Sequence, residues 1–175
     1  MTDANSPKDV GSPPHPMPDL EFDPGKAALT IIDMQYCDAN RHYGLGKILA
    51  ASRPEVAQYY FDRLENVVVP NQLKLLNFFR EKGLRIVYIV VGARLPDFSD
   101  LTPFWRKKAF VPEKELGISG ARVWFHAGEF EYSLLPELKP EENELVIQKT
   151  TSGAFSSSNL DLSLRNVGIE TLVIG

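Results

Sequence analysis

The sequence predicts an α/β fold in which a parallel sheet carries helices on both faces. The first observation is a set of short apolar runs, each long enough for one buried strand: 27–32, 84–91, 145–147 and 169–174. The second observation is that segments with a helical spacing of apolar residues separate these runs. Strands that alternate with helices in this way usually pair in parallel, and continuous apolar runs are typical of strands covered on both faces. We therefore expect a doubly wound sheet.

Proline and glycine positions indicate where the helices begin and end. Pro54 fits the first turn of one helix, and a second helix is expected to follow Pro70 and to end at Gly83. A further helix is predicted over 159–166, just before the last strand. Two segments lack a clear pattern and are predicted as long loops: 36–51 and 92–120. Long loops in compact domains are usually functional or mobile, so the second segment is a candidate lid over a site.

Composition excludes several classes of protein. The 175 residues suit one domain, with 43% hydrophobic and 24% charged residues. A net charge of -4 without a basic cluster argues against nucleic acid as the main partner. No stretch is apolar for long enough to cross a bilayer, and no signal peptide is visible, so we expect no membrane partner and a cytoplasmic location. The single cysteine, Cys37, excludes an internal disulfide and a multi-cysteine zinc site.

Residues 1–25 differ from the rest of the chain. They contain six of the thirteen prolines, among polar residues. Such a composition does not bury enough apolar surface to order itself. We expect a disordered or arm-like tail, which either has no fixed contacts or lies over a neighbouring subunit. The folded domain is then 26–175.

Two charged residues of opposite sign follow predicted strands. Asp33 comes directly after the run 27–32, and Lys149 comes just past the run 145–147. Ligand sites of open α/β sheets lie at the carboxyl ends of the strands. We expect the two strands to be neighbours, so that these residues form an ion pair at that edge. Such a pair is either a structural salt bridge or part of an active site.

The sequences around these residues carry a family resemblance. IIDMQ at 31–35 and VIQKTTSGAF at 146–155, in this order, resemble motifs of the isochorismatase-like cysteine hydrolases. That family includes nicotinamidases, N-carbamoylsarcosine amidase and ureidoacrylate amidohydrolases. The resemblance covers roughly 26–175 and implies a Rossmann-like fold. It also implies an Asp-Lys-Cys triad, in which Asp33 and Lys149 match the first two members.

The resemblance implies a cysteine-dependent hydrolase of a small amide, ureide or carbamoyl C–N bond. The family's cysteine follows the strand that corresponds to 169–174, so we expect the nucleophile beyond Gly175. Residues 26–175 would then be the N-terminal part of one hydrolase domain, lacking the last strands. The 175-residue chain alone is expected to be inactive and poorly soluble unless another segment completes it. The alternative is a non-catalytic relative that acts as a binding or assembly module.

Further expectations concern the pocket and its partners. Five residues near the two motifs or in the candidate lid are predicted to bind a small-molecule substrate: Gln35, Tyr36, Phe104, Trp105 and Phe155. We expect a homo-oligomer, either a dimer or a tetramer, and no cofactor. Some nicotinamidase-like relatives hold a metal with Asp and His after the second strand. Here that loop, GARLPDFSDLTP, has no histidine, so no metal is expected.

Cys37 is an alternative nucleophile, with His42 as a possible base. Its neighbours Asp33 and Asp38 would raise the pKa of its thiol, whereas a nucleophilic cysteine needs a cation or a helix N-terminus. A lone cysteine is more often a small packed hydrophobic residue. The sequence therefore favours a packing role for Cys37.

Overall fold

The computed structural model describes residues 21–175 and contains one parallel four-stranded sheet. Its strands are β1 (Ala27–Ile32), β2 (Arg85–Val91), β3 (Leu145–Lys149) and β4 (Thr171–Ile174). Their order is β3-β2-β1-β4, and every pairing is parallel. The predicted parallel sheet is thus confirmed. The prediction that the Asp33 and Lys149 strands are neighbours is wrong, because β2 lies between β1 and β3.

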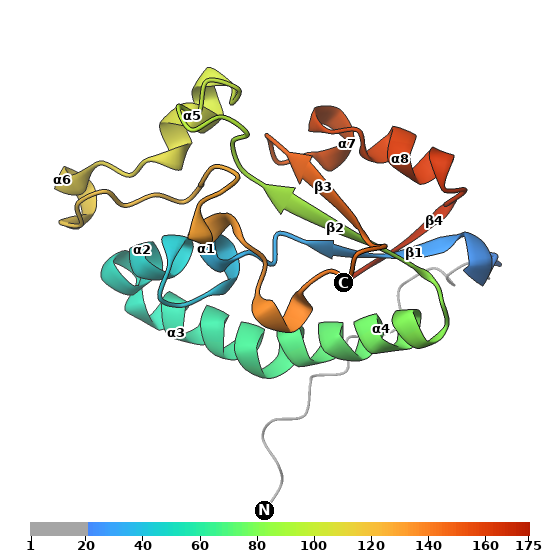
Figure 1. Cartoon of the computed structure of the whole chain (residues 1–175). Coiled ribbons are helices and arrows are strands. Elements are labelled where there is room, and N and C mark those ends of the chain that lie inside the picture. The colour runs from blue at the N-terminus through green and yellow to red at the C-terminus, as the bar shows by residue number, and fades with distance from the viewer. Residues whose placement is uncertain (1–20) are drawn as a thin grey trace, which may run out of the picture.

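Helices cover both faces of the sheet (Figure 1). On one face, Leu29 and Ile31 of β1 pack with Leu76 and Phe79 of helix α4 (Val69–Glu81). On the other face, Ala28 packs with residues of α8 (Leu160–Asn166). Successive strand residues therefore enter different apolar clusters, as alternation along a strand requires. The two clusters hold the sheet in a layered α/β arrangement.

One long helical segment lies along the lower face in Figure 1. It runs through α3 (Pro54–Arg63), a π-helical stretch over Leu64–Val68 and α4. The helices predicted at Pro54 and after Pro70 are confirmed as α3 and α4, although Pro70 does not interrupt the helical segment and the π-helical stretch joins the two. A proline lacks the N–H for an intrahelical bond, and the wider turns of a π-helix just before it accommodate that loss.

The predicted loop over 36–51 is mainly helical. It contains α1 (Tyr36–Ala39) and α2 (Gly44–Ser52). Two glycines in this segment are needed for close packing. A Cβ at Gly44 would overlap the Cys37 backbone, and one at Gly46 would overlap the Arg41 backbone. Glycine allows these two short helices to approach each other.

The predicted loop over 92–120 also contains helices, α5 (Pro103–Ala109) and α6 (Glu113–Leu116). Between α6 and β3 the chain forms two 3-10 turns, Phe130–Tyr132 and Pro136–Leu138. A short helix, α7 (Ala154–Ser157), follows β3, and α8 confirms the helix predicted over 159–166. The chain from α5 to the first 3-10 turn extends past the carboxyl ends of the strands (Figure 1).

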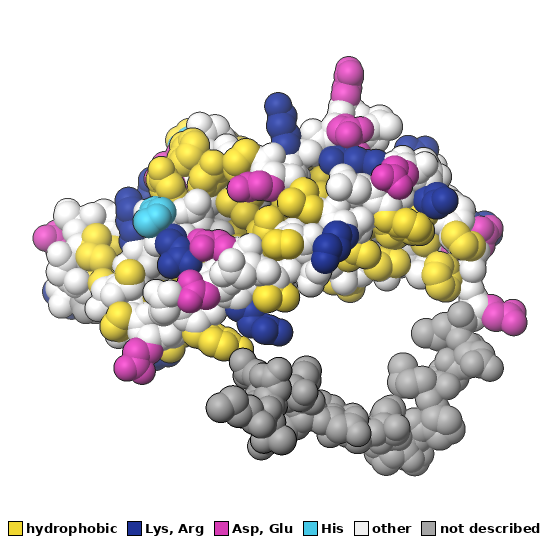
Figure 2. All heavy atoms as spheres, turned by 90° about the horizontal axis from the view of Figure 1, so that it is seen from below, with side chains coloured by type: hydrophobic (Ala, Val, Ile, Leu, Met, Phe, Trp, Pro, Cys, Tyr) yellow, Lys and Arg dark blue, Asp and Glu magenta, His cyan; other side chains and the backbone are white. Residues whose placement is uncertain are grey.

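The predicted tail lies mostly outside the described residues. Its described part ends in a 3-10 turn, Pro24–Lys26, which Asp23 caps by accepting a hydrogen bond from the Gly25 amide. Figure 2 views the molecule from the side of α3 and α4, and hydrophobic side chains are interspersed there with charged ones. Tyr59 and Phe78 are examples of exposed hydrophobic residues on these helices. Within 21–175, the structure has no helix with the length and apolarity that a membrane crossing needs.

Candidate active site

Asp33 occupies a tight turn at the carboxyl end of β1. Its backbone has φ 55°, in the left-handed region that residues other than glycine rarely adopt. The turn is held by a hydrogen bond of 2.9 Å from the Asp33 amide to the Ile89 carbonyl of β2. A strained conformation that the surroundings enforce in this way is common at functional sites. The turn directs the carboxyl group toward the end of β3.

Lys149 ends β3 and crosses the end of β2 to reach Asp33. Its Nζ donates to Asp33 Oδ2 at 2.8 Å and to the Ser152 carbonyl at 3.0 Å. The residue is only 5% exposed. The expected meeting of Asp33 and Lys149 at the carboxyl edge of the sheet is confirmed. Their catalytic roles stay predictions.

The carboxyl group of Asp33 is in an environment that favours proton uptake. Burial raises its pKa above the ordinary value of 3.8, and the hydrogen bond from Lys149 limits that rise. Its second oxygen, Oδ1, is buried and has no hydrogen-bond partner among the described residues. A carboxylate with one free acceptor oxygen beside a cation is suited to take and return a proton.

A cavity of about 490 Å³ opens above this pair. Trp105 of α5 forms part of its wall and stacks on Trp124, with ring centroids 4.5 Å apart and an interplanar angle of 13°. Tyr60 of α3 also lines the cavity, as does Asp38 of α1. The site therefore combines a polar floor with aromatic walls, which is typical of small-molecule sites.

Among the predicted substrate-binding residues, only Trp105 lines this cavity. The others lie elsewhere: Gln35, Tyr36, Phe104 and Phe155. The predicted lid thus supplies one wall through Trp105, and its closing motion stays a prediction. Phe104 points away, packs edge-on against Trp105 and is 60% exposed. Neighbouring residues of a helix face different directions, so both could not line one wall.

Gln35 has a structural position rather than a place in the cavity. Its side chain is fully buried, and its amide nitrogen donates to the carbonyls of Val91 and Tyr132 at 3.1 and 2.7 Å. Its amide oxygen accepts from the Val91 amide at 2.7 Å. These bonds tie the turn after β1 to the end of β2. Tyr36 instead joins an aromatic cluster with Tyr43 and Phe130.

Asp38, Tyr60 and Trp124 are cavity residues that the sequence did not indicate. Burial and the nearby charge of Asp33 raise the pKa of Asp38 to about 6. The only signal for Asp38 was its place five residues after Asp33, which a short helix converts into proximity. Tyr60 and Trp124 come from distant segments, and no motif links them to the site.

Cys37 does not line the cavity, and its side chain is 1% exposed. Its Sγ lies 3.6 Å from Asp38 Oδ2 and donates to it. Burial and the adjacent carboxylate raise the pKa of the thiol far above its usual range. Cys37 therefore stays protonated, in agreement with a packing role.

The described residues contain no group of three or more His, Cys, Asp or Glu side chains arranged to hold a metal. The cavity presents two carboxyl groups, and Lys149 neutralises one of them. A divalent cation prefers several oxygen ligands, and an ammonium in their midst opposes it. Metal independence stays a prediction for the activity assay.

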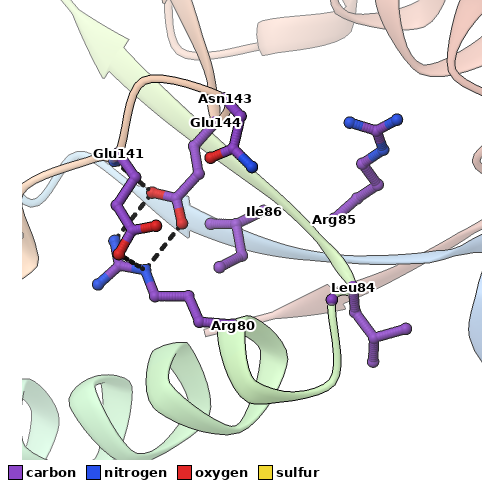
Figure 3. Close-up of a pocket in the computed structure, with 8 residues that line it drawn as sticks. Arg80, Leu84, Arg85, Ile86, Glu141, Asn143 and Glu144 are labelled. Carbon is purple, nitrogen blue, oxygen red and sulfur yellow. Dashed lines mark hydrogen bonds and ion pairs between the residues drawn. The ribbon is translucent and has the colours of Figure 1, made fainter.

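A second hollow, of about 310 Å³, lies at the other end of the strands, where β2 and β3 begin (Figure 3). Arg80 forms a bidentate pair with Glu144, both bonds being 2.8 Å, and contacts Glu141 at 3.3 Å. These residues point toward one another and fasten α4 to the chain entering β3. The charged groups of this cluster pair with one another and lie far from Asp33, so the role of the cluster is structural.

Open α/β sheets bind ligands at the carboxyl ends of their strands, and small-molecule sites are mostly apolar or aromatic with a few placed polar groups, as in this cavity. Residues 27–175 match the family model described as Isochorismatase domain. The chain therefore belongs to the isochorismatase family. This confirms the resemblance on which the predicted fold and the Asp33 and Lys149 assignments were based.

Individual relatives are more distant. The chain is 27% identical over 163 residues to ureidoacrylate amidohydrolase RutB of Pseudomonas savastanoi pv. phaseolicola, covering 88% of this chain and 60% of that protein. It resembles the structure of a cysteine hydrolase from Pseudomonas syringae pv. phaseolicola 1448A with a TM-score of 0.65 at 17% identity, covering 92% and 63% of the two chains. N-carbamoylsarcosine amidase from Thermoplasma acidophilum gives a TM-score of 0.51 at 24% identity, covering 85% and 66%. The chain thus spans about 60% of the length of the first relative.

Proposed function

We propose that this protein belongs to a hydrolase that cleaves the C–N bond of a small amide, ureide or carbamoyl compound with Asp33, Lys149 and a cysteine. The observation that carries the proposal is the 2.8 Å contact between Asp33 and Lys149 below the aromatic cavity. The family match and the RutB relatives support the reaction class. Cytoplasmic location and assembly into a dimer or tetramer are part of the same proposal.

In the proposed chemistry, Asp33 takes up one proton and returns it in each half-reaction. Asp33 takes the proton of a cysteine thiol, and the ammonium of Lys149 stabilises the thiolate. The thiolate attacks the carbonyl carbon, and collapse of the tetrahedral intermediate breaks the C–N bond. Asp33 returns the proton to the leaving amine. Water then attacks the thioester, Asp33 takes a proton from it, and collapse of the second tetrahedral intermediate breaks the C–S bond. Asp33 returns that proton to the departing sulfur, so the acid product and the free thiol are released.

The proposed nucleophile is a cysteine in polypeptide that follows Gly175. β4 runs parallel to β1, with Ile174 level with Thr30, and the Gly175 amide donates to the Thr30 carbonyl at 3.0 Å. Chain continuing in this register comes level with Asp33 within a few residues. Cys37 is unsuitable because its thiol is buried and paired with a carboxylate.

The test is to express residues 1–175 with and without any downstream coding sequence and to assay a panel of small amides, ureides and carbamoyl compounds. We expect activity only when the chain is completed. Asp33→Asn and Lys149→Met should each lower kcat/KM by about 10²- to 10⁴-fold, the range for acid–base groups. Asp161→Asn and Lys74→Met, which change exposed residues outside the cavity, are the matched controls. Far-UV circular dichroism establishes that each variant folds.

Two outcomes would oppose the proposal. An active 175-residue chain that loses all turnover on Cys37→Ser would assign the nucleophile to Cys37. A completed chain that binds amides without hydrolysing any of them would favour the alternative, a non-catalytic binding or assembly module. Mass spectrometry of an acylated cysteine peptide during turnover would decide directly for the hydrolase.

A further inference from the structure

The candidate cavity contains more negative than positive charge. Asp33 and Asp38 both line it, and Lys149 is the one cation among its described lining residues. The ammonium of Lys149 is already bound to Asp33 and to the Ser152 carbonyl. Asp38 accepts only a weak bond from Cys37 Sγ, and no ion pair to it is present within 21–175. Asp38 is therefore a cavity carboxylate without a cationic partner.

The walls around these carboxyl groups are aromatic. Tyr60, Trp105 and Trp124 line the same cavity, and the two indole rings stack nearly parallel. The faces of aromatic rings carry partial negative charge and attract cations, with tryptophan the strongest. The charge of Asp38 also reaches Tyr60, whose pKa is raised by burial and by the carboxylates of Asp38 and Asp33. Walls and carboxylate thus create negative potential in the same space.

We propose that the substrate carries a positively charged ammonium or amidinium group, which Asp38 and the aromatic walls bind while the scissile amide lies at Asp33 and Lys149. The inference rests on the proposed function, because it concerns the substrate class of that site. A cation supplies the partner that Asp38 lacks. An anionic amide would instead bring a second negative charge against an uncompensated carboxylate, which disfavours binding.

Burial makes this selectivity stronger than it would be at an open surface. Asp38 is only partly accessible, and its pKa of about 6 keeps it largely ionised at neutral pH. Charge-assisted hydrogen bonds and cation–π contacts strengthen when water is excluded. We expect the cationic group to improve binding by about 10- to 100-fold over a neutral group of the same shape.

The protein provides its own reporter for this test. Its sequence contains two tryptophans, Trp105 and Trp124, and both line the cavity. Intrinsic tryptophan fluorescence therefore responds to ligands in this space. The probe is choline, compared with 3,3-dimethylbutan-1-ol, its neutral isostere, at constant ionic strength in a buffer without amines. We expect choline to change the fluorescence at concentrations at least tenfold lower than the isostere does.

Two variants assign the effect. Asp38→Asn keeps the shape of the side chain and an acceptor for Cys37 but removes the charge, so choline and its isostere should then titrate alike. Asp161→Asn removes an exposed carboxylate outside the cavity and should leave the choline titration unchanged. Equal titration of the two probes in the natural protein would overturn the inference, whatever the behaviour of the variants.

Turnover separates this inference from the proposed function. In the completed chain, amides that carry an ammonium group should have higher kcat/KM than neutral or anionic amides of the same length. Hydrolysis without this preference, together with equal titration of the probes, overturns the cation site and leaves the hydrolase. Selective choline binding without hydrolysis of any amide supports the cation site and overturns the hydrolase.

Discussion

Asp38→Asn should make the protein more stable at neutral pH, even though it removes a charged residue of the candidate site. Burial is the main reason that the pKa of this carboxyl rises from 3.8 to about 6, and the charge of Asp33 adds to it. Each tenfold change in acid strength is worth about 1.4 kcal/mol, so the ionised Asp38 destabilises the folded state by about 3 kcal/mol at pH 7. Partial exposure to the cavity reduces the expected gain for asparagine to about 2 kcal/mol.

The sign of the pH dependence follows from proton binding. Between about pH 4 and pH 6 the folded state holds the Asp38 proton more tightly than the unfolded state does, so unfolding releases a proton. As pH rises through this window, the free energy of unfolding of the natural protein should fall relative to that of Asp38→Asn. Above the window, the difference between the two proteins should stay constant. The other titratable groups around Asp38 are Asp33, Cys37, Lys149 and Tyr60, and all are common to both proteins.

The assay is urea denaturation followed by far-UV circular dichroism from pH 4 to pH 8, in buffers without amines. Asp161→Asn is the matched control, and the opposite pH dependence is expected for it. Because Arg165 lowers the pKa of Asp161, the natural protein should lose stability relative to Asp161→Asn as pH falls. A difference between the natural protein and Asp38→Asn that is constant with pH would refute the reasoning. So would a less stable Asp38→Asn protein at pH 7.

Three other predictions follow from the same structure. Arg80→Met should lower stability by about 3 to 5 kcal/mol, since Glu144 loses its partner. Although burial opposes it, Arg80 holds the pKa of Glu144 below 4.5, so the deficit in urea denaturation should shrink as pH falls through that lowered pKa. Gln35→Leu should lower stability by about 2 to 4 kcal/mol, measured in the same way, because the buried N–H and C=O of Val91 lose their partner. Turnover of the completed chain should survive exhaustive chelation, and its loss with recovery on adding zinc or iron would contradict this.

The strands were predictable from sequence, but their order was not. Apolar runs covered on both faces are long and distinctive, as in 27–32 and 84–91. Strand order depends on which helical crossovers pack against which face, and the runs themselves do not encode this. The meeting of Asp33 with Lys149 was predicted correctly for an incorrect reason. The long lysine side chain reaches across β2 to a strand that is not its neighbour.

The walls of the cavity were largely unpredictable for a related reason. Trp105 was expected in the wall and Phe104 with it, yet only the orientation of α5 decides which of the two faces the cavity. Asp38 became a wall residue because 36–39 is helical, whereas the lack of a clear apolar pattern had predicted a loop there. Contacts between segments distant in sequence leave no periodic signal. The motifs thus locate the acid and the lysine, and the tertiary fold alone determines what surrounds them.

The effect of Asp38 on the stability of the protein is linked thermodynamically to the binding of a cation. A ligand that binds the ionised carboxylate more tightly than the neutral one must lower its pKa by the corresponding amount. Saturating choline should therefore remove the fall in stability between about pH 4 and pH 6 that distinguishes the natural protein from Asp38→Asn. The ionised Asp38 destabilises the empty site, next to the strained backbone of Asp33 and to Lys149, which is already paired with Asp33. A bound cation that compensates for this cost would explain why such a group is present. Choline that binds without changing this pH dependence would place the cation elsewhere than at Asp38.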